Sequence, residues 1–153
     1  METPRETVVV VDDDPVMRQA LDGLLSVLGY RTELYASAAE FLGAADTTEA
    51  ACLMLDIQLG AMTGIDLARK LEASGFNFPI LFMTGSDDEQ FRRDAIDLGC
   101  VAFLRKPFRT DQLMQAICKA TGSRHYFCAR GRHRQRVRQR NRQHDDCSKL
   151  SAN

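Results

Sequence analysis

Short apolar runs alternate with segments in which apolar residues recur every three or four positions, five times between Thr7 and Ala120. A short continuous apolar run is typical of a strand buried on both faces, and the three-to-four repeat is typical of an amphipathic helix. Alternating strands and helices predict an α/β fold with a doubly wound parallel sheet. The runs predict strands over Thr7–Val11, Ala51–Leu55, Pro79–Met83 and Val101–Leu104, and the more polar segment Arg31–Tyr35 is predicted as a second, weaker strand.

Capping residues indicate where the five helices begin and end. Asp14 and Pro15 predict an N-cap and a first-turn proline for a helix over Val16–Leu28, and Gly29 suits its left-handed end. The same rules set the other boundaries. They predict capping boxes at Ser37–Glu40 and Ser86–Glu89, a third helix from Gly64 to Ser74, a stop at Gly99, a loop-like Gly43–Ala50, and a last helix capped by Thr110 and ended by Thr121-Gly122.

Polar residues stand at the carboxyl ends of four predicted strands. Because parallel strands all point the same way, these side chains are expected to converge in one crevice. Clustered carboxylates repel one another unless a cation intervenes, and Mg²⁺ prefers hard oxygen ligands. With a hydroxyl and an ammonium, such a cluster indicates magnesium-dependent phosphoryl transfer to an aspartate. The residues are Asp12, Asp13 and Asp14 after the first strand, Asp56 after the third, Thr84 after the fourth and Lys106 after the fifth.

Each of these residues also has a structural interpretation. Asp12–Asp14 alone fit turn and capping chemistry, and we expect Asp14 to act only as a cap. Thr84 alone would be a local cap and Lys106 alone a solvated side chain, but their joint placement favours the functional interpretation. A cis Lys106–Pro107 bond would turn the ammonium back into the crevice, although only about 5% of X–Pro bonds are cis.

The formal net charge of −1 conceals two oppositely charged parts. Residues 1–121 carry 11 Lys+Arg and 19 Asp+Glu, a net charge of −8, whereas residues 122–153 carry 9 and 2, a net charge of +7. We therefore predict one acidic domain, 1–121, and a basic tail, 122–153. In the tail, arginine alternates with polar residues and helix-turn-helix patterning is absent, which predicts disorder and leaves no room for a DNA-binding domain.

Three hypotheses remain open for the tail. Its arginines would bind nucleic-acid phosphates, or they would contact the acidic domain or an acidic partner, or the tail is solvated with no fixed partner. It is also compatible with the remnant of a truncated or frameshifted reading frame. A zinc site is not expected, because the spacing of Cys128, His133, His144 and Cys147 matches no compact metal pattern.

Cysteine usage and hydropathy narrow the class of protein. The five cysteines show no disulfide-framework spacing and no charged-then-apolar leader starts the chain, which predicts a reduced, cytoplasmic protein. No apolar run approaches the roughly 18–20 residues that cross a bilayer, so we expect no membrane span. The cysteines are Cys52, Cys100, Cys118, Cys128 and Cys147.

Over about residues 5–121 the chain resembles the receiver domain of bacterial two-component response regulators. The resemblance implies a flavodoxin-like five-stranded sheet with strand order 2-1-3-4-5. It also implies a phosphoacceptor switch in phosphorelay signal transduction rather than a metabolic enzyme. The motifs that carry it are Val10-Val11-Asp12-Asp13-Asp14-Pro15, Leu53-Met54-Leu55-Asp56-Ile57-Gln58-Leu59, Met62-Thr63-Gly64, Phe82-Met83-Thr84-Gly85 and Phe103-Leu104-Arg105-Lys106-Pro107-Phe108.

The resemblance further implies a role for each site residue. Asp56 would accept a phosphoryl group from a sensor histidine kinase or a phosphotransfer protein. Mg²⁺ would be held by Asp13, Asp56 and the main-chain carbonyl of Gln58, with Asp12 acting through water. The remaining roles are Thr84 as the switch hydroxyl, Phe103 as the aromatic rotamer partner, which also fits simple strand packing, and Lys106 as the phosphate-binding ammonium.

The same resemblance places partner surfaces and exposes one departure. The first helix would contact the phosphodonor, and the fourth helix, fifth strand and fifth helix would form a homodimer or dock a partner. Where the family usually has proline, four residues after Asp56, this chain has Gly60 and Ala61, which predicts a looser loop. The alternatives are a truncated transcriptional regulator or nucleic-acid-binding protein whose tail is gated by the receiver, and, more remotely, a phosphatase-like hydrolase with Asp12 as nucleophile.

Overall fold

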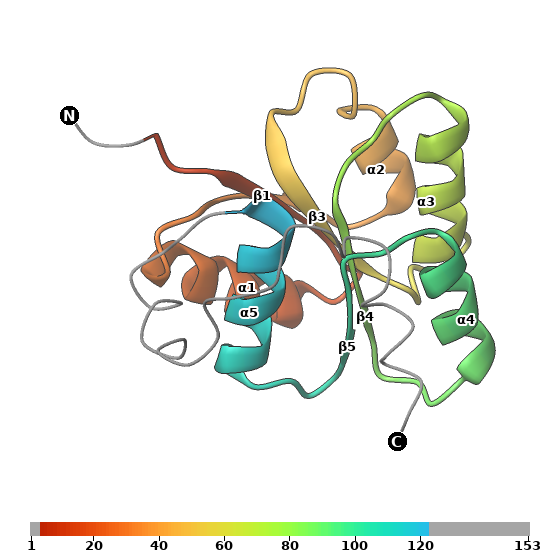
Figure 1. Cartoon of the computed structure of the whole chain (residues 1–153). Coiled ribbons are helices and arrows are strands. Elements are labelled where there is room, and N and C mark those ends of the chain that lie inside the picture. Colours follow the sequence, from red (N-terminus) through yellow and green to blue (C-terminus); the bar gives the residue numbers. More distant parts are fainter. Residues whose placement is uncertain (1–3, 123–153) are drawn as a thin grey trace, which may run out of the picture.

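The structure is a computed structural model that describes residues 4–122. Strands and helices alternate along this part of the chain (Figure 1). The basic tail predicted after Thr121 lies outside the described residues except for Gly122. The elements are β1 (Thr7–Val11), α1 (Pro15–Val27), β2 (Arg31–Tyr35), α2 (Ala38–Leu42), β3 (Ala50–Asp56), α3 (Gly64–Ala73), β4 (Ile80–Thr84), α4 (Glu89–Asp97), β5 (Ala102–Arg105) and α5 (Thr110–Thr121).

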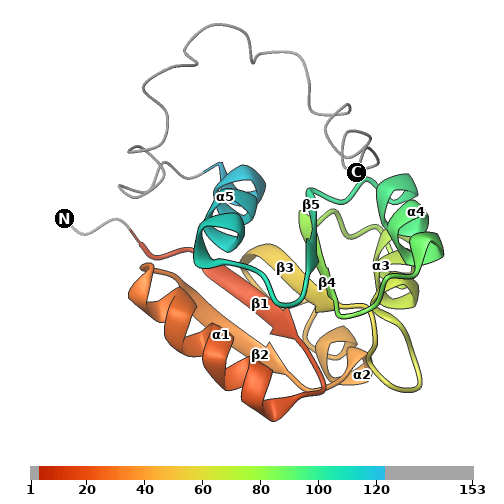
Figure 2. The ribbon, with the colours of Figure 1, turned by 90° about the horizontal axis from the view of Figure 1, so that it is seen from below.

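The five strands form one parallel sheet in the order β2-β1-β3-β4-β5. The predicted doubly wound α/β fold and strand order are therefore confirmed. Helices α1 and α5 cover one face, and α2, α3 and α4 cover the other (Figure 2). All five carboxyl strand ends consequently meet at the same edge of the sheet.

Side-chain alternation in the central strands divides the core into two layers. In β1, Val9 and Val11 face the α2–α3–α4 layer, whereas Val8 and Val10 face the α1–α5 layer. All four of these valines are fully buried. A strand with buried residues on both faces needs an unbroken apolar run, which explains why β1 lacks a polar alternation. The core therefore fixes the position of β1 up to Val11, the residue before Asp12.

Two strands extend one residue further toward the site than predicted. β3 ends at Asp56 rather than Leu55, and β4 ends at Thr84 rather than Met83, because ladder pairs join Asp56 to Met83 and Thr84 to Arg105. β5 is likewise displaced by one residue, to Ala102–Arg105. Asp56 and Thr84 are therefore held by the backbone of the sheet itself and do not belong to loops.

Two predicted helix caps are wrong by one or two residues. The N-cap of α5 is Arg109 and not Thr110, since Gln112 Oε1 accepts the Arg109 main-chain N–H at 2.9 Å. The N-cap of α4 is Asp88 and not Ser86, since Asp88 Oδ1 accepts the Gln90 N–H at 2.9 Å. In both cases several polar residues compete for the free N–H groups of the first turn, and their backbone conformation decides between them.

Other predicted boundaries are confirmed. Asp14 caps α1 by accepting the Val16 N–H at 2.9 Å, with Pro15 at the first helical position. Gly29 and Gly122 have positive φ angles of 95° and 69° at the ends of α1 and α5. In the described part of the chain, no helix combines the length and apolar character that a membrane span requires.

The cysteine prediction is met only in part. Cys52 and Cys100 are free and buried. Cys118 in α5 is disulfide-bonded, so the prediction that all five thiols are reduced is wrong at this residue. Cys128 and Cys147 lie outside the described residues, and so do His133 and His144.

Candidate functional site

Carboxylates from two strand ends come together at the carboxyl edge of the sheet. Asp12 and Asp13 follow β1, and Asp56 ends β3, the central strand. Ligand oxygens of these three residues all lie within 4.8 Å of one another. Asp12 and Asp56 are buried, whereas Asp13 is exposed. The predicted cluster is thus formed by residues 44 positions apart in sequence because their parallel strands pair directly with the same polarity.

Lys106 bridges the two buried carboxylates. Its Nζ lies 2.8 Å from Asp12 Oδ2 and 3.1 Å from Asp56 Oδ2. Burial by itself would lower the pKa of Lys106, but the hydrogen bond to Asp12 and the charge of Asp56 outweigh it, so the pKa is raised. Lys106 is therefore a fixed positive charge in the crevice. The Lys106–Pro107 peptide bond is cis.

Asp56 is a carboxylate with a perturbed proton affinity. Burial raises the pKa of Asp56 to about 6, the charge of Asp12 adds to the increase, and Lys106 opposes it. Its Oδ1 accepts the main-chain N–H of Gln58 at 3.1 Å. Near neutral pH the group is still mostly ionised, so Asp56 keeps the charge that a nucleophile or a metal ligand needs.

Thr84 ends β4, the strand next to Asp56, and Phe103 lies on the neighbouring strand β5. Thr84 is fully buried, and its Oγ1 accepts the Ser86 N–H at 3.1 Å. Phe103 is partly buried and lines a pocket of about 270 Å³ with the Ser86–Glu89 segment, Arg92 and Arg105. An aromatic ring at the wall of a pocket has space to move into, so this geometry is compatible with the predicted switch.

The segment that joins β3 to α3 passes very close to Asp56. Gly64 donates its N–H to the Ile57 carbonyl at 2.9 Å, and a Cβ at Gly64 would lie 2.4 Å from the main-chain oxygen of Asp56. Gly60 has a φ of +84°, which glycine adopts freely and proline cannot reach. Gly60 therefore takes a backbone conformation that the proline expected from the resemblance could not adopt.

Three features of the site were not predicted from the sequence. Arg18 donates from Nη1 to the main-chain carbonyl of Asp12 at 2.7 Å. Arg105 forms an ion pair with Asp87 across the pocket beside Phe103. Gly64 was predicted only as a helix start, not as a close neighbour of Asp56. The one available signal was a glycine at the first position of an amphipathic helix, and this signal does not identify the residue that the glycine approaches.

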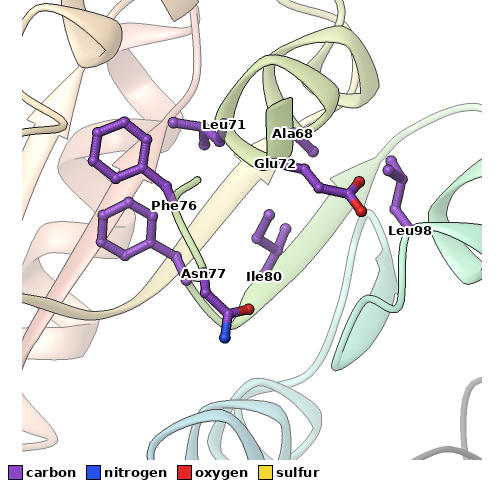
Figure 3. Close-up of a pocket in the computed structure, with 8 residues that line it drawn as sticks. Ala68, Leu71, Glu72, Phe76, Asn77, Ile80 and Leu98 are labelled. Atoms are coloured by element: carbon purple, nitrogen blue, oxygen red, sulfur yellow. The ribbon is translucent and has the colours of Figure 1, made fainter. Parts of the chain in front are cut away.

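A second, smaller hollow lies away from the carboxylates. It has a volume of about 100 Å³ and sits where α3 and α4 end and β4 begins (Figure 3). Phe76, Ile80 and Leu98 supply apolar walls, and Glu72 and Asn77 stand at its side. Ile80 opens β4, whereas Asp56 ends the neighbouring strand β3, so this hollow is at the other end of the sheet. It takes no part in the predicted chemistry.

Comparisons with known proteins agree with the geometry. Residues 8–118 match the family described as Response regulator receiver domain. The response regulator protein TmoT of Ectopseudomonas mendocina is 35% identical over 117 residues, which are 76% of this chain and 53% of TmoT. The transcriptional regulatory protein FixJ of Bradyrhizobium diazoefficiens is 36% identical over 115 residues, 75% of this chain and 56% of FixJ.

A solved structure supports the same assignment. The crystal structure of FixJ-N superposes with a TM-score of 0.73 at 30% sequence identity and covers 78% of this chain and 96% of that chain. The chain spans about half the length of the curated relatives TmoT and FixJ. By sequence, fold and the placement of its strand-end residues, the chain belongs to the family of response regulator receiver domains, which act in two-component signalling.

Proposed function

We propose that Asp56 accepts a phosphoryl group, and that this step connects the chain to two-component signalling. The observation that carries the proposal is that Asp56 lies beside the carboxylates of Asp12 and Asp13 and within hydrogen-bond distance of the Lys106 ammonium. In the reaction, a carboxylate oxygen of Asp56 forms a bond to phosphorus. The bond between phosphorus and the leaving imidazole of a donor phosphohistidine breaks, and the electron pair leaves with the imidazole.

The oxygen donors of this crevice fit Mg²⁺. Asp13, Asp56 and the main-chain carbonyl of Gln58 would hold the ion, with Asp12 acting through water. The hydrogen bonds of Asp12 support this division, because its Oδ1 already accepts the Asp14 N–H and its Oδ2 already accepts from Lys106. The exposed Asp13 carboxylate makes no such hydrogen bond among the described residues. When bound, Mg²⁺ would neutralise charge on the transferring group.

Lys106 and Thr84 serve the phosphorylated state. The ammonium of Lys106 is close enough to both buried carboxylates to reach an oxygen of a phosphoryl group on Asp56. Thr84 would exchange its contact with the Ser86 N–H for one with the phosphoryl group. Phe103 would then turn into the space between β5 and the Ser86–Glu89 segment. The chain is thus a phosphoacceptor switch and at most catalyses its own phosphorylation and dephosphorylation.

The partners follow from this role. Receiver domains interact with histidine kinases or phosphotransfer proteins, and we assign contact with the donor to α1. Output would pass through the face formed by α4, β5 and α5, either to a second copy of the chain or to a different partner. The cytoplasmic location stays a prediction.

The basic segment after Thr121 suggests a second candidate function. FixJ is a transcriptional regulatory protein by name, and this chain has 9 Lys+Arg in residues 122–153. In this alternative the receiver domain, 1–121, gates nucleic-acid binding by the tail. DNA binding measured across a salt titration, with the full chain and with a full-length variant whose tail arginines are glutamine, separates the two. Equal, weak binding by both contradicts the alternative.

The primary proposal is tested by intact mass after incubation with acetyl phosphate and Mg²⁺. The wild type should gain one phosphoryl group, and Asp56→Asn should gain none. Asp46→Asn removes an exposed carboxylate outside the cluster and should react like the wild type. An adduct on Asp56→Asn, or none on a folded wild type, would contradict Asp56 as the acceptor.

A further inference from the structure

Arg18 makes a contact with the site that the roles above leave unexplained. It lies in the first turns of α1, is half-buried, and donates from Nη1 to the main-chain carbonyl of Asp12 at 2.7 Å. Its own main-chain N–H bonds to the Asp14 carbonyl at 3.0 Å. The side chain therefore reaches back from the helix to the turn that carries Asp12 and Asp13.

Every polar group of Asp12 has a partner. Its main-chain N–H donates to the Tyr35 carbonyl at 3.1 Å, Oδ1 accepts the Asp14 N–H at 2.9 Å, and Oδ2 accepts from Lys106 at 2.8 Å. The main-chain carbonyl accepts from Arg18. The contacts from Lys106 and Arg18 are both charge-assisted, a class of hydrogen bond about twice as strong as a neutral one.

The contact from Arg18 constrains Asp13 as well. The Asp12 carbonyl belongs to the peptide unit that joins Asp12 to Asp13, and this unit is planar. Holding the carbonyl oxygen therefore orients the whole plane and the direction in which the chain continues to Asp13. The Asp13 carboxylate is exposed and makes no hydrogen bond of its own in the described part of the chain, so its position relative to Asp56 depends on its backbone.

We propose that Arg18 is a positioning residue of the phosphoryl-transfer site: through the Asp12 carbonyl it orients Asp13 and so raises the affinity of the carboxylate cluster for its divalent cation. This inference rests on the proposed function. It makes a prediction of definite sign, because a guanidinium that acted only through its charge would repel the cation and lower the affinity. Loss of a hydrogen bond that orients a metal ligand from a residue outside the coordination shell typically lowers metal affinity by about 10–100-fold.

The test is a calorimetric titration of Mg²⁺ into the full chain. Arg18→Leu should weaken Mg²⁺ binding by about 10-fold, and Arg18→Lys, which keeps a donor and the charge, should recover part of that loss. Arg31→Leu is the matched control, since it removes the same charge from the exposed side of β2 and should bind Mg²⁺ like the wild type. Thermal unfolding in chelator shows whether each variant is folded.

A double-mutant cycle with Asp13→Asn separates positioning from a general loss of structure. If Arg18 acts through Asp13, then Arg18→Leu should change Mg²⁺ affinity far less in the Asp13→Asn background than in the wild type. Unchanged or tighter binding by Arg18→Leu overturns the inference, and so does an equal effect in both backgrounds. Should Arg18→Leu fail to fold, Arg18→Gln and Arg18→Lys carry the same comparison.

The outcome also distinguishes this inference from the proposed function. A wild type that binds Mg²⁺ and gains the phosphoryl group, together with an Arg18→Leu variant that binds Mg²⁺ equally well, removes only the role of Arg18. A folded wild type that neither binds Mg²⁺ nor gains the adduct removes both.

Discussion

The ammonium of Lys106 lies 2.8 Å from Oδ2 of Asp12, a carboxylate with no exposed surface. Lys106→Met keeps the length of the side chain and removes the charge, which leaves the buried carboxylates of Asp12 and Asp56 to repel each other. Removing one partner of a buried pair typically costs about 3–5 kcal/mol. We expect the free energy of unfolding to fall by about 3 kcal/mol in chelator, because Lys106 keeps some exposure.

Urea unfolding with and without Mg²⁺ checks this prediction for Lys106. Lys70→Met is the control, since Lys70 is an exposed lysine on α3. The divalent cation should restore part of the lost stability in Lys106→Met, because it supplies the missing positive charge. A loss no larger than that of Lys70→Met would contradict a structural role for the ammonium.

The pKa of Asp56 predicts a stability effect that depends on pH. Because burial and Asp12 raise this pKa from 3.8 to about 6, the protonated form is favoured in the folded state. The resulting stabilisation is complete below about pH 4 and is lost as the pH rises through about 6. Asp56→Asn should therefore be more stable than the wild type at pH 7.5, and its advantage should shrink toward pH 4.

Thermal unfolding of Asp56→Asn across this pH range, in chelator, is the measurement. Asp46→Asn serves as the control for the loss of one exposed carboxylate. An advantage for Asp56→Asn that grows as the pH falls would contradict the raised pKa.

Gly64 is predicted to tolerate no side chain. The Cβ of Gly64→Ala would lie 2.4 Å from the Asp56 carbonyl oxygen, which is main chain and cannot rotate away. We expect a loss of about 1–3 kcal/mol in stability and slower phosphorylation, since the end of β3 must shift. Gly23→Ala is the control: its Cβ meets nothing within 4 Å, and in a helix the change should stabilise by about 0.5–1 kcal/mol. Equal stabilities of the two variants would contradict the close contact.

Gly60 makes a prediction about the loop where the family usually has proline. Its φ of +84° is unfavourable for any other residue, so Gly60→Ala should lose about 1–2 kcal/mol although its Cβ has free space. Gly60→Pro should lose more, because the proline ring fixes φ near about −65°. The order of the two melting temperatures is the measurement. A Gly60→Pro variant as stable as the wild type would show that the loop adopts another conformation at no cost.

Much of the fold follows from local patterns. The four valines of β1 and the apolar run before Asp56 identify buried strands, and alternation with helices implies a parallel sheet. Parallel strands bring their carboxyl ends to one edge whatever the details of packing. The convergence of Asp12, Asp56 and Lys106 was therefore predictable from the positions of these residues along the chain.

The contacts within the site were not predictable in the same way. The N-caps at Asp88 and Arg109 depended on which of several neighbouring polar groups met a free N–H, and no local pattern separates them. The hydrogen bond from Arg18 to the Asp12 carbonyl depended on how α1 packs against β1. Residue types and their order along the chain are sufficient to predict strands, helices and the edge where the strands end, because apolar periodicity and capping residues are local features of the sequence. Distances such as that from Lys106 Nζ to Asp12 Oδ2 join side chains from distant segments, and they exist only once the sheet and helices have assembled.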